Sequence, residues 1–242
     1  MDATGASDAT PARSLGVVMG LPLVDGVFAT LVVTGGLDSV TGILEVGLLV
    51  FGGAATTALL LASEADRRAD VHRVLTIGVP VLALAAAEAA VAPSLLALLD
   101  AEAFRPFAGL VLVAVAARVA AAHVTRYLPA PGLVVLVGVV VSFDPGGSLA
   151  LQPDPEVATR ALAAAGVGVG SALAVVLARP RLRRVLDPER FRIGSAVALG
   201  TMGASVAGLV PQGSPLPLAA FVLAVVLALE PRSGGDRDPS TP

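Results

Sequence analysis

The chain has 242 residues, of which 55% are hydrophobic and only 14% are charged, and its formal net charge is −3. A soluble domain normally carries about 25% charged residues, so this composition favours an integral membrane protein. The small net charge gives no reason to expect nucleic-acid binding. The absence of cysteine excludes disulfides, thiolate metal sites and cysteine nucleophiles, and two histidines are too few for a histidine-rich metal or haem site. We therefore expect neither a metal nor a cofactor.

Eight apolar runs follow one another between two short polar tails. A transmembrane helix needs about 20 apolar residues, and most of these runs have about that length. The tails, residues 1–14 and 231–242, are small and polar, which predicts disorder. The sequence thus predicts an all-α integral membrane protein with about eight transmembrane helices. The runs lie at residues 15–35, 40–62, 74–99, 105–123, 131–150, 157–178, 193–211 and 215–230.

The positions of the arginines indicate how these helices are oriented. Cytoplasmic loops of membrane proteins carry an excess of positive charge. All 16 basic residues are arginine, and with a cytoplasmic N-terminus 13 of them fall on cytoplasmic segments. Arg105 and Arg160 fall on outer loops, and Arg118 falls within a span. This distribution predicts a multi-pass protein of the cytoplasmic membrane with both termini in the cytoplasm.

Similar landmarks recur in the two halves of the chain. In each half an aspartate, Asp25 or Asp144, precedes an arginine by 48 residues. We therefore expect two four-helix halves, residues 15–123 and 124–230. Four spans per half would make the repeats parallel, because both halves enter the membrane from the same side. In that arrangement the two aspartates would face each other at a similar depth.

Both aspartates stand beside proline and glycine, in "LPLVDG" and "SFDPGG". Such helix breaks are tolerated at membrane depth only where protein or water satisfies the freed backbone groups. Broken helices around polar groups form the binding sites of many secondary transporters, so Asp25 and Asp144 predict a site for a small cation or a proton. A structural role for Asp144 also has a physical basis, because an Asp-Pro pair favours the start of a helix. Asp144 would then cap a half-helix or end a span at the outer surface.

Three further ionisable residues, Glu45, Glu88 and Arg118, fall within predicted spans. Because each would cost about 2.5–3.5 kcal/mol if it faced lipid, we expect them to face the bundle interior or water. Glu45 is either solvated at the outer interface or, if it lies deeper, a further ligand beside Asp25. Glu88 and Arg118 belong to neighbouring antiparallel spans, which predicts a structural ion pair.

Small polar residues and glycines accompany these charges. Gly166 and Gly170 of "GVGVG" have the small-xxx-small spacing that favours close helix packing. Hydroxyl groups within the spans could supply neutral oxygen ligands, although helix packing is their commoner role; these residues are Thr30, Thr34, Thr41, Ser142 and Ser148.

Three stretches resemble a family of uncharacterised haloarchaeal multi-pass membrane proteins, classified only as a domain of unknown function. They are "VMGLPLVDGVFATLVVTGGLDSVTGILEVGLLVFGGAAT" at 18–56, "YLPAPGLVVLVGVVVSFDP" at 127–145 and "RFRIGSAVALG" at 190–200. The resemblance covers nearly the whole chain apart from the tails. It implies a salt-loving archaeal source and the cytoplasmic membrane, and it implies no activity.

The leading interpretation is a small secondary transporter or permease in the lipid bilayer, for a cation or coupled to a cation or proton. Asp25 and Asp144 would form its central site and Glu45 would assist. The alternative is a non-catalytic scaffold or subunit of a larger complex, in which the acids only cap and pair. An intramembrane hydrolase with two aspartates is a third interpretation, but no motif supports it, and we expect no enzyme. The oligomeric state is left open.

Overall fold

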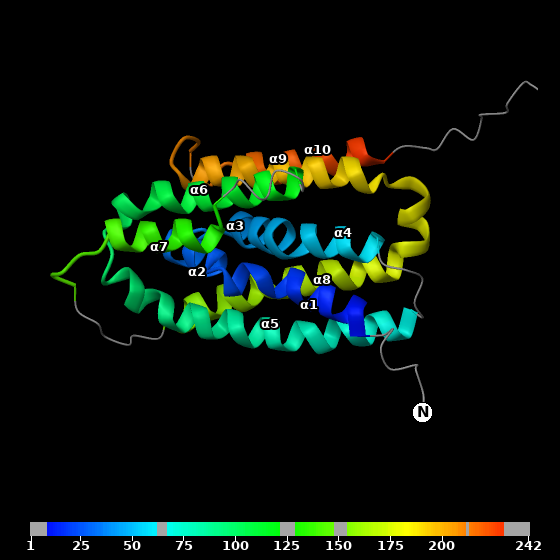
Figure 1. The fold of residues 1–242 in the computed structure, drawn as a ribbon, viewed down its shortest axis with the longest axis horizontal. Helices are drawn as coiled ribbons and strands as arrows, with labels where there is room; N and C mark the ends of the chain where they lie inside the picture. The colour runs from blue at the N-terminus through cyan, green and yellow to red at the C-terminus, as the bar shows by residue number, and fades with distance from the viewer. Residues whose placement is uncertain (1–8, 62–66, 122–128, 148–153, 212, 230–242) are drawn as a thin grey trace, which may run out of the picture.

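The computed structural model describes residues 9–61, 67–121, 129–147, 154–211 and 213–229, and within these ranges the chain is helical, with two isolated bridges and no strand. The helices lie side by side along the long axis of the molecule (Figure 1). In chain order they are α1 (Ala9–Val24), α2 (Val27–Val33), α3 (Val40–Glu45), the π-helix η1 (Val46–Gly52), α4 (Gly53–Leu61), α5 (Arg67–Leu96), α6 (Ala101–Ala120), α7 (Pro131–Val141), α8 (Pro155–Val185), α9 (Pro188–Val206) and α10 (Leu216–Ala228).

Each predicted apolar run coincides with one helix or with consecutive helices. The first run is α1 with α2, the second is α3, η1 and α4, and each of the others corresponds to one helix from α5 to α10. Three helices, α5, α6 and α8, are long and apolar enough to cross a membrane, or up to four spans if the bent pair α1 and α2 is one. This finding fits a membrane protein, whereas the count of eight crossings stays a prediction.

The connections between helices gather at the two ends of the bundle (Figure 1). The start of α1, the end of α10 and the α8–α9 connection lie at one end, which we call the arginine end because Arg179 to Arg192 surround that connection. The connections α2–α3, α5–α6 and α9–α10 lie at the opposite end. Of the arginines that predicted a cytoplasmic side, Arg126, Arg232 and Arg237 lie outside the described residues.

The first helix begins earlier than the sequence predicted. α1 starts at Ala9, inside the stretch 1–14 that was expected to be disordered. Alanine is the best helix former, and a proline near a helix start costs little because the first N–H groups lack partners in any case. Pro11 therefore does not prevent a helix here. Residues 1–8 and the predicted tail 231–242 lie outside the described residues.

Aspartate side chains start three of the helices. Asp100, Asp154 and Asp187 precede α6, α8 and α9, and each carboxylate accepts hydrogen bonds from two backbone N–H groups of the first turn. In α8 and α9 a proline occupies the first helical position, where its fixed φ favours helix initiation. These caps fix where the helices begin and so fix which residues lie at each end of the bundle.

The two predicted halves are packed into one another. α8, from the second half, packs against α5, η1 and α4 of the first half, and α6 packs against α9 and α7. The rings of Phe28 and Phe51 meet with centroids 5.4 Å apart in the core between these helices. The interlocking means that side chains from distant parts of the sequence line the spaces within the bundle.

A glycine between the two predicted packing glycines makes the close contact on α8. A Cβ at Gly168 would lie 2.4 Å from Cβ of Phe51, whereas a Cβ at Gly166 or Gly170 would meet nothing within 4 Å. The small-xxx-small prediction is therefore wrong in its position. Residues two positions apart lie on nearly opposite faces of an α-helix. Gly168 therefore faces η1, whereas Gly166 and Gly170 face away from it.

Candidate functional site

The break in the first span lies between α1 and α2, at Asp25 and Gly26. Pro22 removes a backbone donor near the end of α1, and Gly26 adopts φ +72°, a left-handed conformation that glycine reaches without steric cost. The two helix axes differ in direction by 42°. Asp25 thus stands where the helix is interrupted, as the sequence predicted, and its side chain is half-buried.

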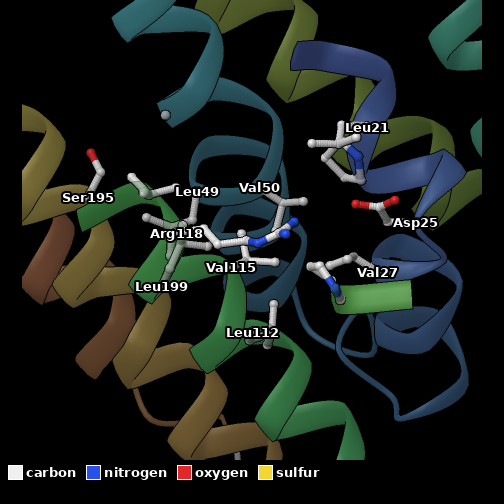
Figure 2. Close-up of a pocket in the computed structure, with 14 residues that line it drawn as sticks. Leu21, Asp25, Val27, Leu49, Val50, Leu112, Val115, Arg118, Ser195 and Leu199 are labelled. Atoms are coloured by element: carbon white, nitrogen blue, oxygen red, sulfur yellow. The ribbon is translucent and has the colours of Figure 1, made fainter. Parts of the chain in front are cut away.

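A cavity of about 190 Å³ lies beside this break (Figure 2). Its walls come from α1, α2, η1, the first residue of α4, the C-terminal half of α6, the first residue of α7, and α9. Most of the lining is aliphatic. The side chains with charged or hydroxyl groups among its lining residues are Asp25, Arg118 and Ser195.

These three polar groups lie on different sides of the cavity. The guanidinium group of Arg118 extends toward the side on which Asp25 lies (Figure 2). No ion pair joins Arg118 to Asp25 within the described part of the chain, and Nε of Arg118 is buried there without a hydrogen-bond partner. Ser195 is 2% exposed, and its Oγ likewise has no partner in that part.

Unsatisfied polar atoms in an apolar cavity are costly and therefore informative. A buried donor or acceptor without a partner costs about 1–3 kcal/mol, and native proteins contain few of them. Arg118 and Ser195 each contribute one such atom at the same cavity. A polar ligand that supplied the missing hydrogen bonds would remove this cost, so the arrangement suits a small solute with charged groups.

Asp144 lies far from this cavity, contrary to the prediction that it faces Asp25. The first turn of α7 is next to Asp25, since a Cβ at Gly132 would lie 3.7 Å from its carbonyl oxygen. α7 then runs away for 11 residues, or about 16 Å at 1.5 Å per residue, before the chain reaches Asp144. There the exposed carboxylate accepts a hydrogen bond of 2.9 Å from the backbone N–H of Gly146.

This position agrees with the structural alternative for Asp144, the end of a span at a surface turn. The paired-aspartate site is therefore wrong in this structure. Two carboxylates that are separated by the length of a helix cannot share a proton, so the two-aspartate hydrolase finds no support either. A duplication of the chain stays a prediction.

Glu88 and Arg118 do not form the predicted ion pair among the described residues. Glu88 stands about 12 Å from the α5–α6 connection along α5, whereas Arg118 stands about 26 Å from it along α6. The carboxyl group of Glu88 lies beside the backbone N–H of Ala29 in the first turn of α2. The acid thus meets a backbone amide at the start of a half-helix, while its Oε2 is buried without a hydrogen-bond partner in the described residues.

Glu45 is buried, with 8% of its surface exposed, so the prediction of a solvated position at the interface is wrong. It also does not join Asp25. Its Oε1 accepts a hydrogen bond of 3.3 Å from the backbone N–H of Leu218 in the first turn of α10. Glu45 lines a second, smaller pocket of about 70 Å³ near the end of the bundle opposite the arginine end.

Two of the predicted hydroxyl groups also line this second pocket, those of Thr34 and Thr41. Thr30 instead donates to the carbonyl of Gly26 in its own helix. Ser142 is buried at the end of α7, and Ser148 lies outside the described residues.

Sequence reasoning missed Ser195 and a buried charge cluster at the arginine end. Arg179 of α8 contacts Asp70 of α5 at 2.6 Å, and Arg73 contacts the same carboxylate at 3.1 Å. The spacing of Asp70 and Arg73, one helical turn apart, was a readable signal. No pattern in the sequence connects Asp70 to an arginine 109 residues away, or marks one serine of α9 as a cavity residue.

Comparison with known protein families gives a match. A family described as a family of unknown function, DUF5794, matches residues 81–207, which is more than half of the chain. Two of the three stretches that carried the resemblance, 127–145 and 190–200, lie inside this range. Neither a curated protein nor a solved structure matches. The match confirms the prediction of an uncharacterised family, while the haloarchaeal source stays a prediction.

Proposed function

The chain belongs to this family of unknown function, so we propose a function from the site itself: a small secondary transporter that holds its solute in the cavity between Asp25 and Arg118. The observation that carries the proposal is a pair of opposite charges that face one apolar cavity without an ion pair between them in the described residues. Secondary transporters place their solutes at interrupted helices, where backbone and side-chain groups are free to bind.

The charges and the size of the cavity define the class of solute. A carboxylate on one side and a guanidinium on the other complement a zwitterion, with its ammonium group toward Asp25 and its carboxylate toward Arg118. Ser195 would donate a further hydrogen bond. A cavity of about 150 Å³ can hold benzene, so this cavity of about 190 Å³ suits a small amino-acid-like molecule.

We further propose that all eight helical segments cross the cytoplasmic membrane and that the arginine end faces the cytoplasm. The positive-inside rule supports this orientation, because the exposed arginines of the α8–α9 region gather at the end where α1 begins and α10 finishes (Figure 1). Arg118 stands in the last turn of α6, toward the same end.

Solute binding can be tested by thermal unfolding of the purified protein in detergent, because a ligand that binds only the folded state raises its stability. The probes are glycine, alanine, serine and leucine, each compared with its amino alcohol and its simple carboxylic acid. We expect a zwitterion to raise the Tm more than either singly charged analogue. A hundredfold excess over Kd would add about 2.7 kcal/mol.

Asp25→Asn and Arg118→Gln should abolish this selective rise, since each removes one charge and leaves a neutral polar side chain in its place. Arg105→Gln, at a half-buried position near the opposite end of α6 and away from the cavity, is the matched control and should respond as the wild type does. Uptake of the stabilising solute into proteoliposomes then measures transport directly. Equal responses to zwitterions and to their analogues would contradict the proposal.

A scaffold without transport is the second candidate, and a specific observation favours it. Glu45 and Glu88 each meet a backbone N–H in the first turn of a helix, α10 and α2, and Asp144 closes a turn. These contacts give the acids structural roles that do not depend on a transported solute. The scaffold predicts that Asp25→Asn changes the Tm equally with and without every solute, and that no flux is detected.

A further inference from the structure

The second pocket lies where two helices end. Its wall includes Thr34 and Gly36, which follow the half-helix α2, and Ser205 in the last turn of α9. The C-terminal end of a helix carries the negative end of its dipole. In both helices the last carbonyl groups also accept hydrogen bonds from the residues that follow, such as Gly36 N–H to the carbonyl of Leu31 and Leu209 N–H to that of Ala204. Two helix C-termini at one small pocket therefore favour a positive charge.

Glu45 supplies a full negative charge to this pocket. The residue is more than nine-tenths buried, and one carboxylate oxygen, Oε1, is bonded to the N–H of Leu218. Its second oxygen has no hydrogen-bond partner within the described ranges. A buried carboxylate needs a compensating charge or a complete set of hydrogen bonds, and this one has only part of such a set.

Residues with neutral oxygen atoms line the same pocket as the carboxylate. Oγ of Ser205 is buried and has no partner in the described part of the chain, although serine hydroxyls can both donate and accept. Gly42 allows the carbonyl of Gly36 to reach the helix backbone, since a Cβ at position 42 would lie 2.2 Å from that oxygen. Thr41 adds a further hydroxyl to the lining.

We propose that this pocket is a binding site for one small monovalent cation of the Na⁺ type. Carboxylate, hydroxyl and carbonyl oxygens are the ligands that hard cations prefer. Glu45 is the one acidic residue among the lining side chains, and no three histidine, cysteine or acidic side chains come together in the described residues. One carboxylate neutralises one positive charge, so a divalent ion would leave an uncompensated buried charge.

The site lies apart from the solute cavity and is a place for a coupling ion. The π-helix η1 begins directly after Glu45, and its residues Leu49 and Val50 line the solute cavity. Half-helix ends and unwound carbonyls coordinate the ions of secondary transporters. The coupling role rests on the proposed transport function, whereas cation binding does not.

The test is thermal unfolding of the purified full-length protein in detergent, with NaCl replacing choline chloride at constant ionic strength. We expect the Tm of the wild type to rise with Na⁺ and to saturate, because choline is too large for a pocket of about 70 Å³. Equilibrium binding of ²²Na⁺ should reach one ion per chain.

Two variants separate a cation site from a structural acid. Glu45→Gln keeps an oxygen that can accept from Leu218 but loses the charge, and we expect at least a tenfold weaker apparent affinity for Na⁺. Ser205→Ala should also weaken Na⁺ binding, whereas removal of a merely unsatisfied hydroxyl would leave the Na⁺ response unchanged. Thr201→Val, one turn earlier on α9, is the control, because its hydroxyl already bonds to Ala198.

Each outcome has one meaning. Equal stabilisation by Na⁺ and choline, or Na⁺ responses of Glu45→Gln and Ser205→Ala that equal that of the wild type, would overturn the cation site. Stabilisation by acid pH alone, with no bound ²²Na⁺, would also overturn it in favour of proton binding. Bound Na⁺ without any solute flux would support the cation site and contradict the proposed transport function. Solute flux without bound Na⁺ would support the transport function and contradict the cation site.

Discussion

A methyl group added at Gly168 has no space, and this makes position 168 a sharp test of the packing between α8 and η1. Overpacking a filled core costs about 1–3 kcal/mol, and the added Cβ would lie 2.4 Å from Cβ of Phe51 and 3.2 Å from the carbonyl oxygen of Gly47. We expect Gly168→Ala to lower the Tm of the purified protein measurably in thermal unfolding.

Gly166→Ala and Gly170→Ala are matched controls on the same helix. Nothing lies within 4 Å of a Cβ at either position, and alanine is favoured over glycine in a helix by up to about 1 kcal/mol. These variants should therefore equal or exceed the wild-type Tm. A larger loss at Gly166 or Gly170 than at Gly168 would mean that a different face of α8 is packed.

Between elements, the contact between Asp70 and Arg179 ties the start of α5 to α8. Both side chains are 8% exposed and their atoms are 2.6 Å apart. Removal of one partner from a buried ion pair costs about 3–5 kcal/mol, because the other charge stays buried. We expect Asp70→Ala to reduce the free energy of unfolding by an amount of this order, measured by thermal or chemical unfolding in detergent.

The control for this change is Glu102→Gln. It removes an exposed carboxylate whose Oε1 lies 3.9 Å from Nη1 of Arg105. Exposed pairs contribute about 0–1 kcal/mol, so this variant should scarcely change stability. If Asp70→Ala and Glu102→Gln had equal effects, the α5–α8 contact would not be a stabilising element.

For the whole molecule, the uneven distribution of charge along the bundle predicts its orientation in a membrane. The chain contains no cysteine, so a single introduced cysteine is a unique label site. Pro145 is exposed beyond α7, and Val185 is exposed at the end of α8, at the arginine end. We expect a membrane-impermeant maleimide to label Pro145→Cys in intact cells and to label Val185→Cys only after the membrane is permeabilised.

Labelling of both positions in intact cells would contradict a sealed crossing between them. The opposite pattern would place the arginine end outside and would overturn the positive-inside assignment. The parent chain, which has no thiol, gives the background in every sample.

Much of the fold could be predicted because hydropathy is a local property. Each helix or group of helices falls on an apolar run, and the break at Asp25 was visible as proline, aspartate and glycine in one such run. The position of Asp144 relative to the end of α7 was predicted less well. The predicted run extended to residue 150, whereas α7 stops at Val141, directly before the stretch "SFDPGG". Asp144 therefore lies in an exposed turn and not in the interior.

The partners of the charged residues could not be predicted, because neighbours in sequence need not be neighbours in the bundle. Arg118 and Glu88 lie on consecutive long helices, yet α6 packs mainly against α9 and α7, and α5 packs mainly against α8. Arg118 therefore shares its cavity with Asp25, from the break between α1 and α2, and with Ser195 from α9. Such long-range packing depends on the shapes of whole helices and leaves no local signal.

The π-helix η1 is a more widely wound stretch between α3 and α4, and such a stretch can be rewound as an α-helix. Glu45 stands directly before it and Gly53 directly after it. A helix turns by about 100° and advances about 1.5 Å per residue, so tightening one wide turn into an α-helical turn would twist one end against the other by about that angle. Glu45 lines the second pocket, and Leu49, Val50 and Gly53 line the solute cavity. We therefore expect a ligand that fixes the winding of η1 at one pocket to fix the direction of the lining side chains at the other.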